Sequence, residues 1–217
     1  MPLKGFIFDL DGTLLDTLPV CYAGFRATLR RYLGREYSDP EIAALFGPSE
    51  AGIFQTLLPD RWQEALRDYL DEYERAHGES VTFTGIPTAL AGLRERSIRL
   101  AIVSGKGRGS LDISLRYSGL GEFFEIVIAG SDRGARKPDH LRQVLEAWGY
   151  APEEVAYVGD TAYDIQAARE AGVHPVAALW AATANPERVQ AMRPWLTFET
   201  VPAFIGWIRE AGSIDMS

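Results

Sequence analysis

The sequence predicts an α/β fold built on a parallel sheet, with an all-helical segment inserted after the first strand. From residue 82 onward, short apolar runs of strand length alternate with helical patterns, as expected for strands joined by crossover helices. The runs are continuously apolar, which is typical of parallel strands buried on both faces. Between residues 16 and 81, apolar residues instead recur at helical spacing and no convincing strand pattern appears.

The elements follow in chain order. Residues 5–8 form the first strand, which ends in a polar turn that begins at Asp9. In the insertion, Ser38 and Glu41 form a capping-box pattern that begins one helix, and a charged amphipathic helix spans 60–77, with Gly78 at its end. Later strands are expected at 99–103, 125–129, 155–158 and 175–179, with helices from Pro87, after Gly107, from Pro138, over 161–171 and over 201–211.

Composition limits the class of function. The chain has 217 residues, of which 47% are hydrophobic, and a formal charge of −8. This length suits one large domain or one domain with an insertion. The acid excess and a pI near 5.0 argue against nucleic acid or an anionic membrane surface as the main partner, but a small anionic substrate is still allowed. The single cysteine, Cys21, excludes a disulfide framework and a cysteine-built zinc site.

The same composition predicts where the protein works. The longest apolar runs are too short for a membrane helix, and the apolar run at residues 6–8 is too short for a signal peptide. We therefore expect a cytoplasmic protein with no membrane partner. Its state as monomer or homodimer is left open.

Two pairs of carboxylates follow predicted strands. Asp9 and Asp11 come directly after the first strand, where side chains two residues apart face the same side. Asp160 and Asp164 end the strand at 155–158 and begin the next helix, four residues apart on one face. Neighbouring carboxylates repel unless a cation or a proton intervenes, and oxygen ligands suit Mg²⁺. The alternatives are a simple Asp-Gly turn at Asp11 and a capping box from Thr161 to Asp164.

Two further segments suggest anion binding. Ser104 and Gly105 follow the strand at 99–103 and open a helix, where backbone N–H groups can hold a phosphate. The run matches neither the dinucleotide-binding pattern nor a Walker A motif. Lys137 precedes Pro138 at a helix start, where a cation opposes the helix dipole. The alternative is an exposed loop lysine.

Together these segments resemble the four motifs of the haloacid dehalogenase superfamily of phosphatases, in order and in position after strands. The matching residues are Asp9-Leu10-Asp11-Gly12-Thr13-Leu14, Ser104, Lys137-Pro138 and Gly159-Asp160-Thr161-x-x-Asp164. Gly130-Ser131-Asp132 followed by Lys137-Pro138 further resembles the phosphoglycolate phosphatase-like branch. The resemblance implies a Rossmann-like core over 1–15 and 82–217, with a helical cap over 16–81.

The resemblance also implies a mechanism. It makes the protein a Mg²⁺-dependent hydrolase of a small, phosphoglycolate-like phosphomonoester, with Asp9 as nucleophile and Asp11 as general acid and base. Mg²⁺ would be held by Asp9, the backbone carbonyl of Asp11 and Asp160, with Asp164 behind them. Phosphate would be bound by Gly12, Ser104, Gly105 and Lys137.

The leaving group and the rival functions are less constrained. The resemblance implies that Ser49 and Glu50 in the cap face the site and recognise the leaving group. The alternative is that this segment is only a turn between two helices. Gly105 stands where relatives commonly carry Asn, which bears on substrate preference. The nearest rival is a sugar-phosphate mutase of the same fold. A non-catalytic phosphate-binding protein is also open, while the long insertion speaks against a phospho-accepting receiver.

Overall fold

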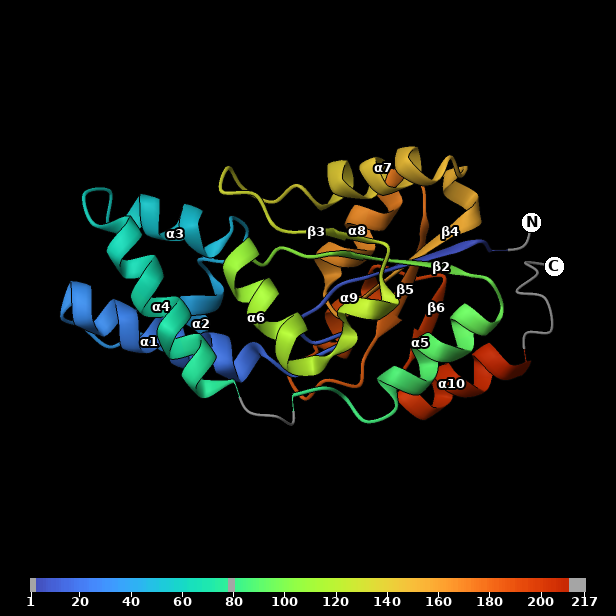
Figure 1. Cartoon of the computed structure of the whole chain (residues 1–217), viewed down its shortest axis with the longest axis horizontal. Helices are drawn as coiled ribbons and strands as arrows, with labels where there is room; N and C mark the ends of the chain where they lie inside the picture. The colour runs from blue at the N-terminus through green and yellow to red at the C-terminus, as the bar shows by residue number, and fades with distance from the viewer. Residues whose placement is uncertain (1–2, 78–80, 211–217) are drawn as a thin grey trace.

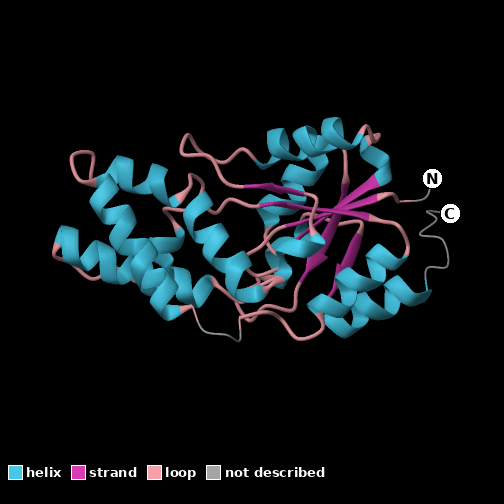
Figure 2. Ribbon diagram, viewed as in Figure 1, coloured by secondary structure: helices cyan, strands magenta, loops and turns pink. Residues whose placement is uncertain are grey.

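The computed structural model describes residues 3–77 and 81–210 as a parallel sheet flanked by helices, with a group of helices beside it (Figures 1 and 2). The sheet has six strands in the order β3-β2-β1-β4-β5-β6, all parallel. They are β1 (Gly5–Phe8), β2 (Arg99–Val103), β3 (Ile126–Ile128), β4 (Val155–Gly159), β5 (His174–Ala178) and β6 (Leu196–Phe198).

The first strand lies in the centre of the sheet because both of its faces are apolar. Phe6 and Phe8 pack into one core cluster and Ile7 into another, so the two faces are buried by different helices. On the first face lie α5 (Ile86–Glu95) and α10 (Val201–Glu210), and on the other α7 (Lys137–Trp148) and α8 (Ala162–Ala171) (Figure 1). This arrangement places β1 between β2 and β4. The strands after β1 are added on one side of it as far as β3, and β4 to β6 are added on the other side.

The inserted helices have a core of their own and lie to the left of the sheet in Figure 1. Phe25, Phe54 and Tyr69 lie at its centre, and the rings of Phe25 and Tyr69 are 4.6 Å apart. α6 (Arg108–Ser118) contributes Ile113 to this core, so the insertion packs on that helix. The helices are α1 (Leu18–Leu33), α2 (Asp39–Ala43), α3 (Glu50–Leu57) and α4 (Trp62–Ala76).

The two chain segments that join the helical insertion to the sheet run side by side. Leu15 forms a bridge with Thr82, and the Asp16 N–H donates to the Val81 carbonyl at 2.6 Å. The insertion therefore leaves and re-enters at nearly the same place. These contacts are consistent with the proposed division into a core and a cap over residues 16–81.

The predicted α/β class, the parallel sheet and the helical insertion are confirmed, with strand bounds shifted by about a residue. β6 and α9 (Pro186–Ala191) are not among the elements predicted from the sequence. β6 has only three residues, Leu-Thr-Phe, on the sheet edge, which is too short for a recognisable apolar run. The predicted helix end at Gly78 lies outside the described residues. In the described part of the chain, no helix is long and apolar enough to cross a membrane.

Candidate active site

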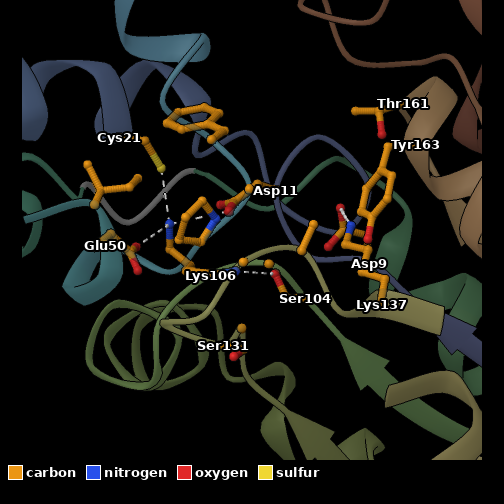
Figure 3. A pocket seen from close by; sticks show the side chains of 18 of the residues that line it. Asp9, Asp11, Cys21, Glu50, Ser104, Lys106, Ser131, Lys137, Thr161 and Tyr163 are labelled. Atoms are coloured by element: carbon orange, nitrogen blue, oxygen red, sulfur yellow. Dashed lines mark hydrogen bonds and ion pairs between the residues drawn. The ribbon is translucent and has the colours of Figure 1, made fainter. Parts of the chain in front are cut away.

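The predicted site residues gather at the carboxyl ends of β1, β2 and β4, where ligands bind in open parallel sheets. There a cavity of about 480 Å³ opens between the sheet and the helical insertion (Figure 3). Its core side includes Asp9, Ser104 and Lys137. Its other side is formed by cap residues such as Phe25 and Tyr69. Residues from distant parts of the chain are thus brought into one pocket.

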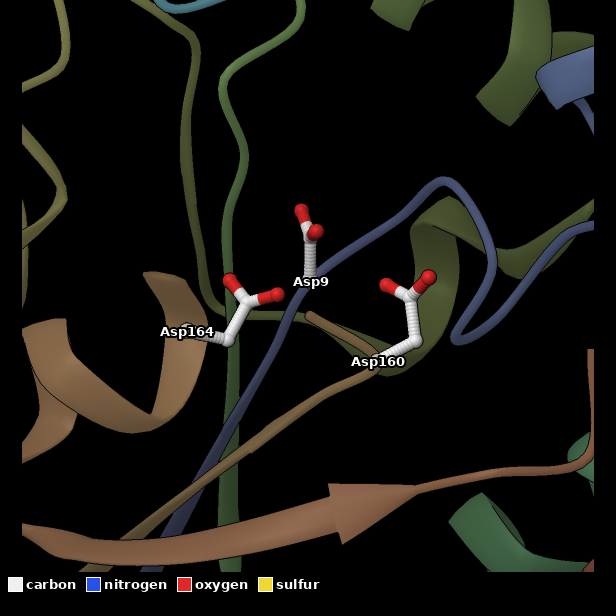
Figure 4. Close-up of side chains that lie close together, drawn as sticks. All are labelled: Asp9, Asp160 and Asp164. Atoms are coloured by element: carbon white, nitrogen blue, oxygen red, sulfur yellow. The ribbon is translucent and has the colours of Figure 1, made fainter. Parts of the chain in front are cut away.

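Three carboxylates converge at the base of this cavity. Asp9, Asp160 and Asp164 are buried, and one oxygen from each lies within 4.8 Å of the others (Figure 4). Burial raises the pKa of Asp9 to about 6, although Lys137 opposes the shift, and burial raises that of Asp160 well above its usual value. Asp9 Oδ1 has no hydrogen-bond partner among the described residues. An unpartnered carboxylate oxygen within an acid cluster fits a hard cation such as Mg²⁺.

Lys137 is the cation that the protein itself supplies to this cluster. As the first residue of α7, it is buried, and its Nζ lies 2.8 Å from Asp9 Oδ2 and 2.5 Å from Asp164 Oδ1. Burial disfavours its charge, but Asp164 and Asp9 raise the pKa of Lys137 well above its usual value. Lys137 is therefore a charged site residue and not the exposed loop lysine considered above.

Asp164 combines a structural and a site role. Its Oδ2 accepts the Thr161 N–H at 3.0 Å, and the Asp164 N–H donates to the Thr161 hydroxyl at 3.2 Å, so the predicted capping box is present. Its Oδ1 accepts from Lys137 and, at 3.0 Å, from the Tyr157 hydroxyl. One oxygen of the Asp164 carboxylate thus caps the N-terminus of α8, and the other belongs to the acid cluster.

Gly12 brings the turn after β1 against Asp160. It has φ +77°, and a Cβ placed there would lie 2.3 Å from Asp160 Oδ2. Any other residue would therefore have a strained backbone at this φ, and its side chain would displace the Asp160 carboxylate. Glycine is required at this point for the turn and the acid cluster to coexist.

Asp11 lines the same cavity as Asp9 but contacts a different lysine. Its Oδ2 accepts from Lys106 Nζ at 3.3 Å, and its Oδ1 accepts from the Thr17 hydroxyl. The two-residue spacing thus places both carboxylates at the cavity, while their side chains have separate environments (Figure 3).

Ser104 and Gly105 follow β2 at the cavity wall. The buried Ser104 hydroxyl accepts the Lys106 N–H at 3.2 Å and so helps to form the turn. A Cβ at Gly105 would lie 4.0 Å from the Lys137 side chain, an ordinary van der Waals contact. A Cβ would therefore fit here, so glycine leaves open space beside Lys137.

Ser49 and Glu50, at the N-terminus of α3, both bind the core. The Ser49 N–H donates to the Ser131 carbonyl at 2.9 Å, and its hydroxyl donates to Asp132. Glu50 accepts the Ser110 hydroxyl at 2.5 Å and also the Gly107 N–H. Besides starting a helix, this segment therefore fastens the cap over the cavity.

Lys106, which lies near the centre of Figure 3, is a site residue that the sequence motifs did not predict. Its buried Nζ is 3.0 Å from Cys21 Sγ, 3.7 Å from Glu50 Oε1 and 4.4 Å from the centroid of the Tyr73 ring. Burial raises the pKa of the Cys21 thiol to about 12, so the thiol stays protonated. The available sequence signal was weak: a lysine two residues after Ser104 in a glycine-rich turn.

These features together define an α/β enzyme with a charged active site. The site is a buried acid cluster with a lysine, at the ends of parallel strands and covered by inserted helices. Residues 6–178 match the family model of the haloacid dehalogenase-like hydrolases, and the chain belongs to this family.

Named relatives agree with this assignment. The chain is 32% identical over 177 residues to the pyrophosphatase PpaX of Bacillus pumilus, covering 80% of this chain and 82% of that protein. It is 31% identical to PpaX of Halalkalibacterium halodurans, with the same coverage. A haloacid dehalogenase-like hydrolase from Streptococcus pneumoniae superposes with a TM-score of 0.76 at 25% identity, covering 94% of this chain and 98% of that one. The predicted family and the predicted phosphatase class are confirmed.

Proposed function

We propose that the protein is a Mg²⁺-dependent phosphomonoester hydrolase that acts on a small phosphorylated metabolite through an aspartyl-phosphate intermediate. The observation that carries the proposal is the state of Asp9. One of its oxygens is held by Lys137, while the other has no partner among the residues described and belongs to a carboxylate that lines the cavity. A fixed carboxylate beside a buried lysine is suited to attack a phosphate.

The acid cluster also suits the metal. Asp9, Asp160 and the backbone carbonyl of Asp11 would hold Mg²⁺, with Asp164 behind them orienting Lys137. Bound Mg²⁺ would offset the repulsion between a phosphate dianion and the carboxylates.

The protein's own side chains then have distinct tasks. An Asp9 oxygen attacks phosphorus as the bond to the leaving oxygen breaks, and Asp11 donates a proton to that oxygen. Asp11 next takes a proton from the water that hydrolyses the Asp9 phosphate. Lys137 and the turns at Gly12, Ser104 and Gly105 would bind the phosphate oxygens.

Asp11→Asn tests this division of roles. We expect kcat/KM for a simple alkyl phosphate to fall roughly 10²–10⁴-fold, because a poor leaving group needs the proton. The kcat/KM for p-nitrophenyl phosphate should fall much less, because nitrophenolate leaves without one. This ratio, measured by phosphate release with Mg²⁺ present, reports the steps up to departure of the leaving group, so it excludes the later attack of water, which is the same for both esters. Equal losses of kcat/KM on both esters would remove Asp11 from the role of general acid.

The same assays address the rival functions. Net conversion between sugar phosphates without phosphate release would favour a mutase, and binding without turnover would favour a phosphate-binding protein. Phosphoglycolate, suggested by the sequence, and pyrophosphate, suggested by the name of the curated relatives, are the first substrates to assay. A cytoplasmic location, the monomeric or homodimeric state and the absence of a nucleic-acid partner stay predictions.

Closure of the cap can be tested at Gly52 in α3. A Cβ there would lie 2.3 Å from the Asp132 carbonyl oxygen, a backbone atom that cannot swing aside. Gly52→Ala favours the helix itself by about 1 kcal/mol but pushes α3 away from the core. We expect kcat/KM for p-nitrophenyl phosphate to fall up to about 10²-fold in a variant that still folds.

The matched control is Gly206→Ala in α10, where a Cβ meets nothing within 4 Å. It should leave kcat/KM unchanged. If Gly52→Ala also keeps the wild-type kcat/KM, close contact between α3 and the loop at Asp132 is not needed for turnover.

A further inference from the structure

We infer that the alcohol released from the natural substrate is apolar and carries no negative charge. This inference rests on the proposed phosphomonoesterase function and narrows its substrate class. It concerns the part of the cavity beyond the acid cluster, where the cap would cover the leaving group.

The cap side of the cavity is almost entirely apolar. Of the described cap residues that line it, Glu50 alone carries a charge. The others offer aliphatic and aromatic surface, chiefly Leu18, Phe25, Phe46, Pro48, Ile53 and Tyr69. Such a wall binds a leaving group by excluding water from apolar surface.

The one lysine between the acid cluster and this wall is already neutralised. Lys106 has an almost fully buried side chain, and its Nζ lies 3.3 Å from Asp11 and 3.7 Å from Glu50. Glu50 therefore balances this ammonium group even while Asp11 holds the proton that it donates, and Lys106 leaves no unpaired positive charge for an anionic leaving group.

The other cations at the cavity have other partners. Lys137 is bound to Asp9 and Asp164 at the acid cluster. Arg136 donates two hydrogen bonds to Asp139, at 3.0 and 2.8 Å. A carboxylate on the leaving group would lose its hydration beside Glu50 without meeting an unpaired lysine or arginine among the described residues of the cavity.

An apolar leaving group gains contacts instead. Phe46, in the loop before α3, is 40% exposed although its ring is large and apolar. It stacks on Tyr22, with ring centroids 5.9 Å apart and planes 3° apart, and its cavity-lining side is available to a ligand. A hydrocarbon or aromatic group seated there would cover surface that is now exposed.

Two pairs of esters whose leaving groups differ in charge at nearly constant size provide the test. They are 4-carbamoylbenzyl phosphate with 4-carboxybenzyl phosphate, and the amide of 2-phosphoglycolate with 2-phosphoglycolate. In Mg²⁺ buffer we expect kcat/KM to be at least about tenfold higher for the uncharged member of each pair, since like charges oppose each other at the site. The 4-carbamoylbenzyl ester should exceed the phosphoglycolate amide because its ring reaches the apolar wall.

Two substitutions should shift this preference. Glu50→Gln removes one counterion of Lys106, and Phe46→Lys places a cation at the cavity. Each should move the ratio of kcat/KM toward the carboxylated esters by about tenfold. Leu33→Lys is the matched control: Leu33 has a similar exposure of 37% but does not line the cavity, so its ratio should stay that of the wild type.

The outcomes separate the inference from the function on which it rests. Faster hydrolysis of the carboxylated esters by the wild type overturns the inference but leaves the phosphomonoesterase intact. Ratios that stay unchanged in both variants, when both fold, also overturn it. No phosphate release from any of the four esters, with p-nitrophenyl phosphate equally inert, overturns the proposed function itself.

Discussion

Asp9→Asn should abolish turnover, with kcat falling by a factor on the order of 10⁶, as expected when an enzyme loses its nucleophile. The amide keeps the shape of the side chain, but its nitrogen lone pair is delocalised and cannot attack phosphorus. Phosphate release from p-nitrophenyl phosphate measures the loss. In the wild type, a radiolabelled phosphoryl group transferred from substrate to protein and released by hydroxylamine would mark the aspartyl phosphate, and the variant should carry none.

The same variant should fold at least as well as the wild type. Burial raises the pKa of Asp9 to about 6, so at pH 7 its charge opposes folding when metal is absent. The neutral amide removes that charge, and Lys137 keeps its contact with Asp164. We expect an unchanged or higher melting temperature in metal-free buffer. Near wild-type turnover in Asp9→Asn would exclude the covalent mechanism, whereas a fall in stability would reveal an unexpected structural role.

Removing divalent metal should have a comparably large effect. Asp9, Asp160 and Asp164 share one ammonium group, Lys137, so their excess negative charge repels a phosphate. EDTA should bring phosphate release to the background rate, and added Mg²⁺ should restore it.

A second measurement does not depend on activity. Mg²⁺ that binds only the folded state should raise the melting temperature, and the rise should increase with metal concentration. Asp160→Asn removes one carboxylate of the cluster and should shift both responses to higher Mg²⁺. Full turnover after exhaustive chelation, or a melting temperature insensitive to Mg²⁺, would contradict the metal site.

Much of the fold could be read from the chain because its signals are local. The run Phe6-Ile7-Phe8 is apolar at every position, and a strand with two buried faces requires that pattern. The convergence of Asp9 and Asp160 also followed from the sequence, because parallel strands end at one edge of a sheet. The short edge strand β6 lacks such a signal, since its burial depends on neighbours far along the chain.

The surroundings of Lys106 could not be predicted for a similar reason. Its partners Asp11, Cys21 and Glu50 come from the turn after β1 and from two separate cap helices. Only the packing of the cap on α6 brings them to one ammonium group. The spacing of apolar residues in each segment is the same whether or not Lys106 contacts these partners. The sequence pattern therefore carries no information about the distances between them.

The position of β1 has a consequence for the synthesis of the protein. Residues 5–8 leave the ribosome well before the strands they pair with, 99–103 on one side and 155–159 on the other. The apolar strand that carries Asp9 therefore has no partner strand until residue 103 is made and only one until residue 159, whereas the cap helices, which have local contacts, can form earlier. A nascent chain must keep Phe6, Ile7 and Phe8 from aggregating over this interval, and Asp9 and Asp160 can meet only after it.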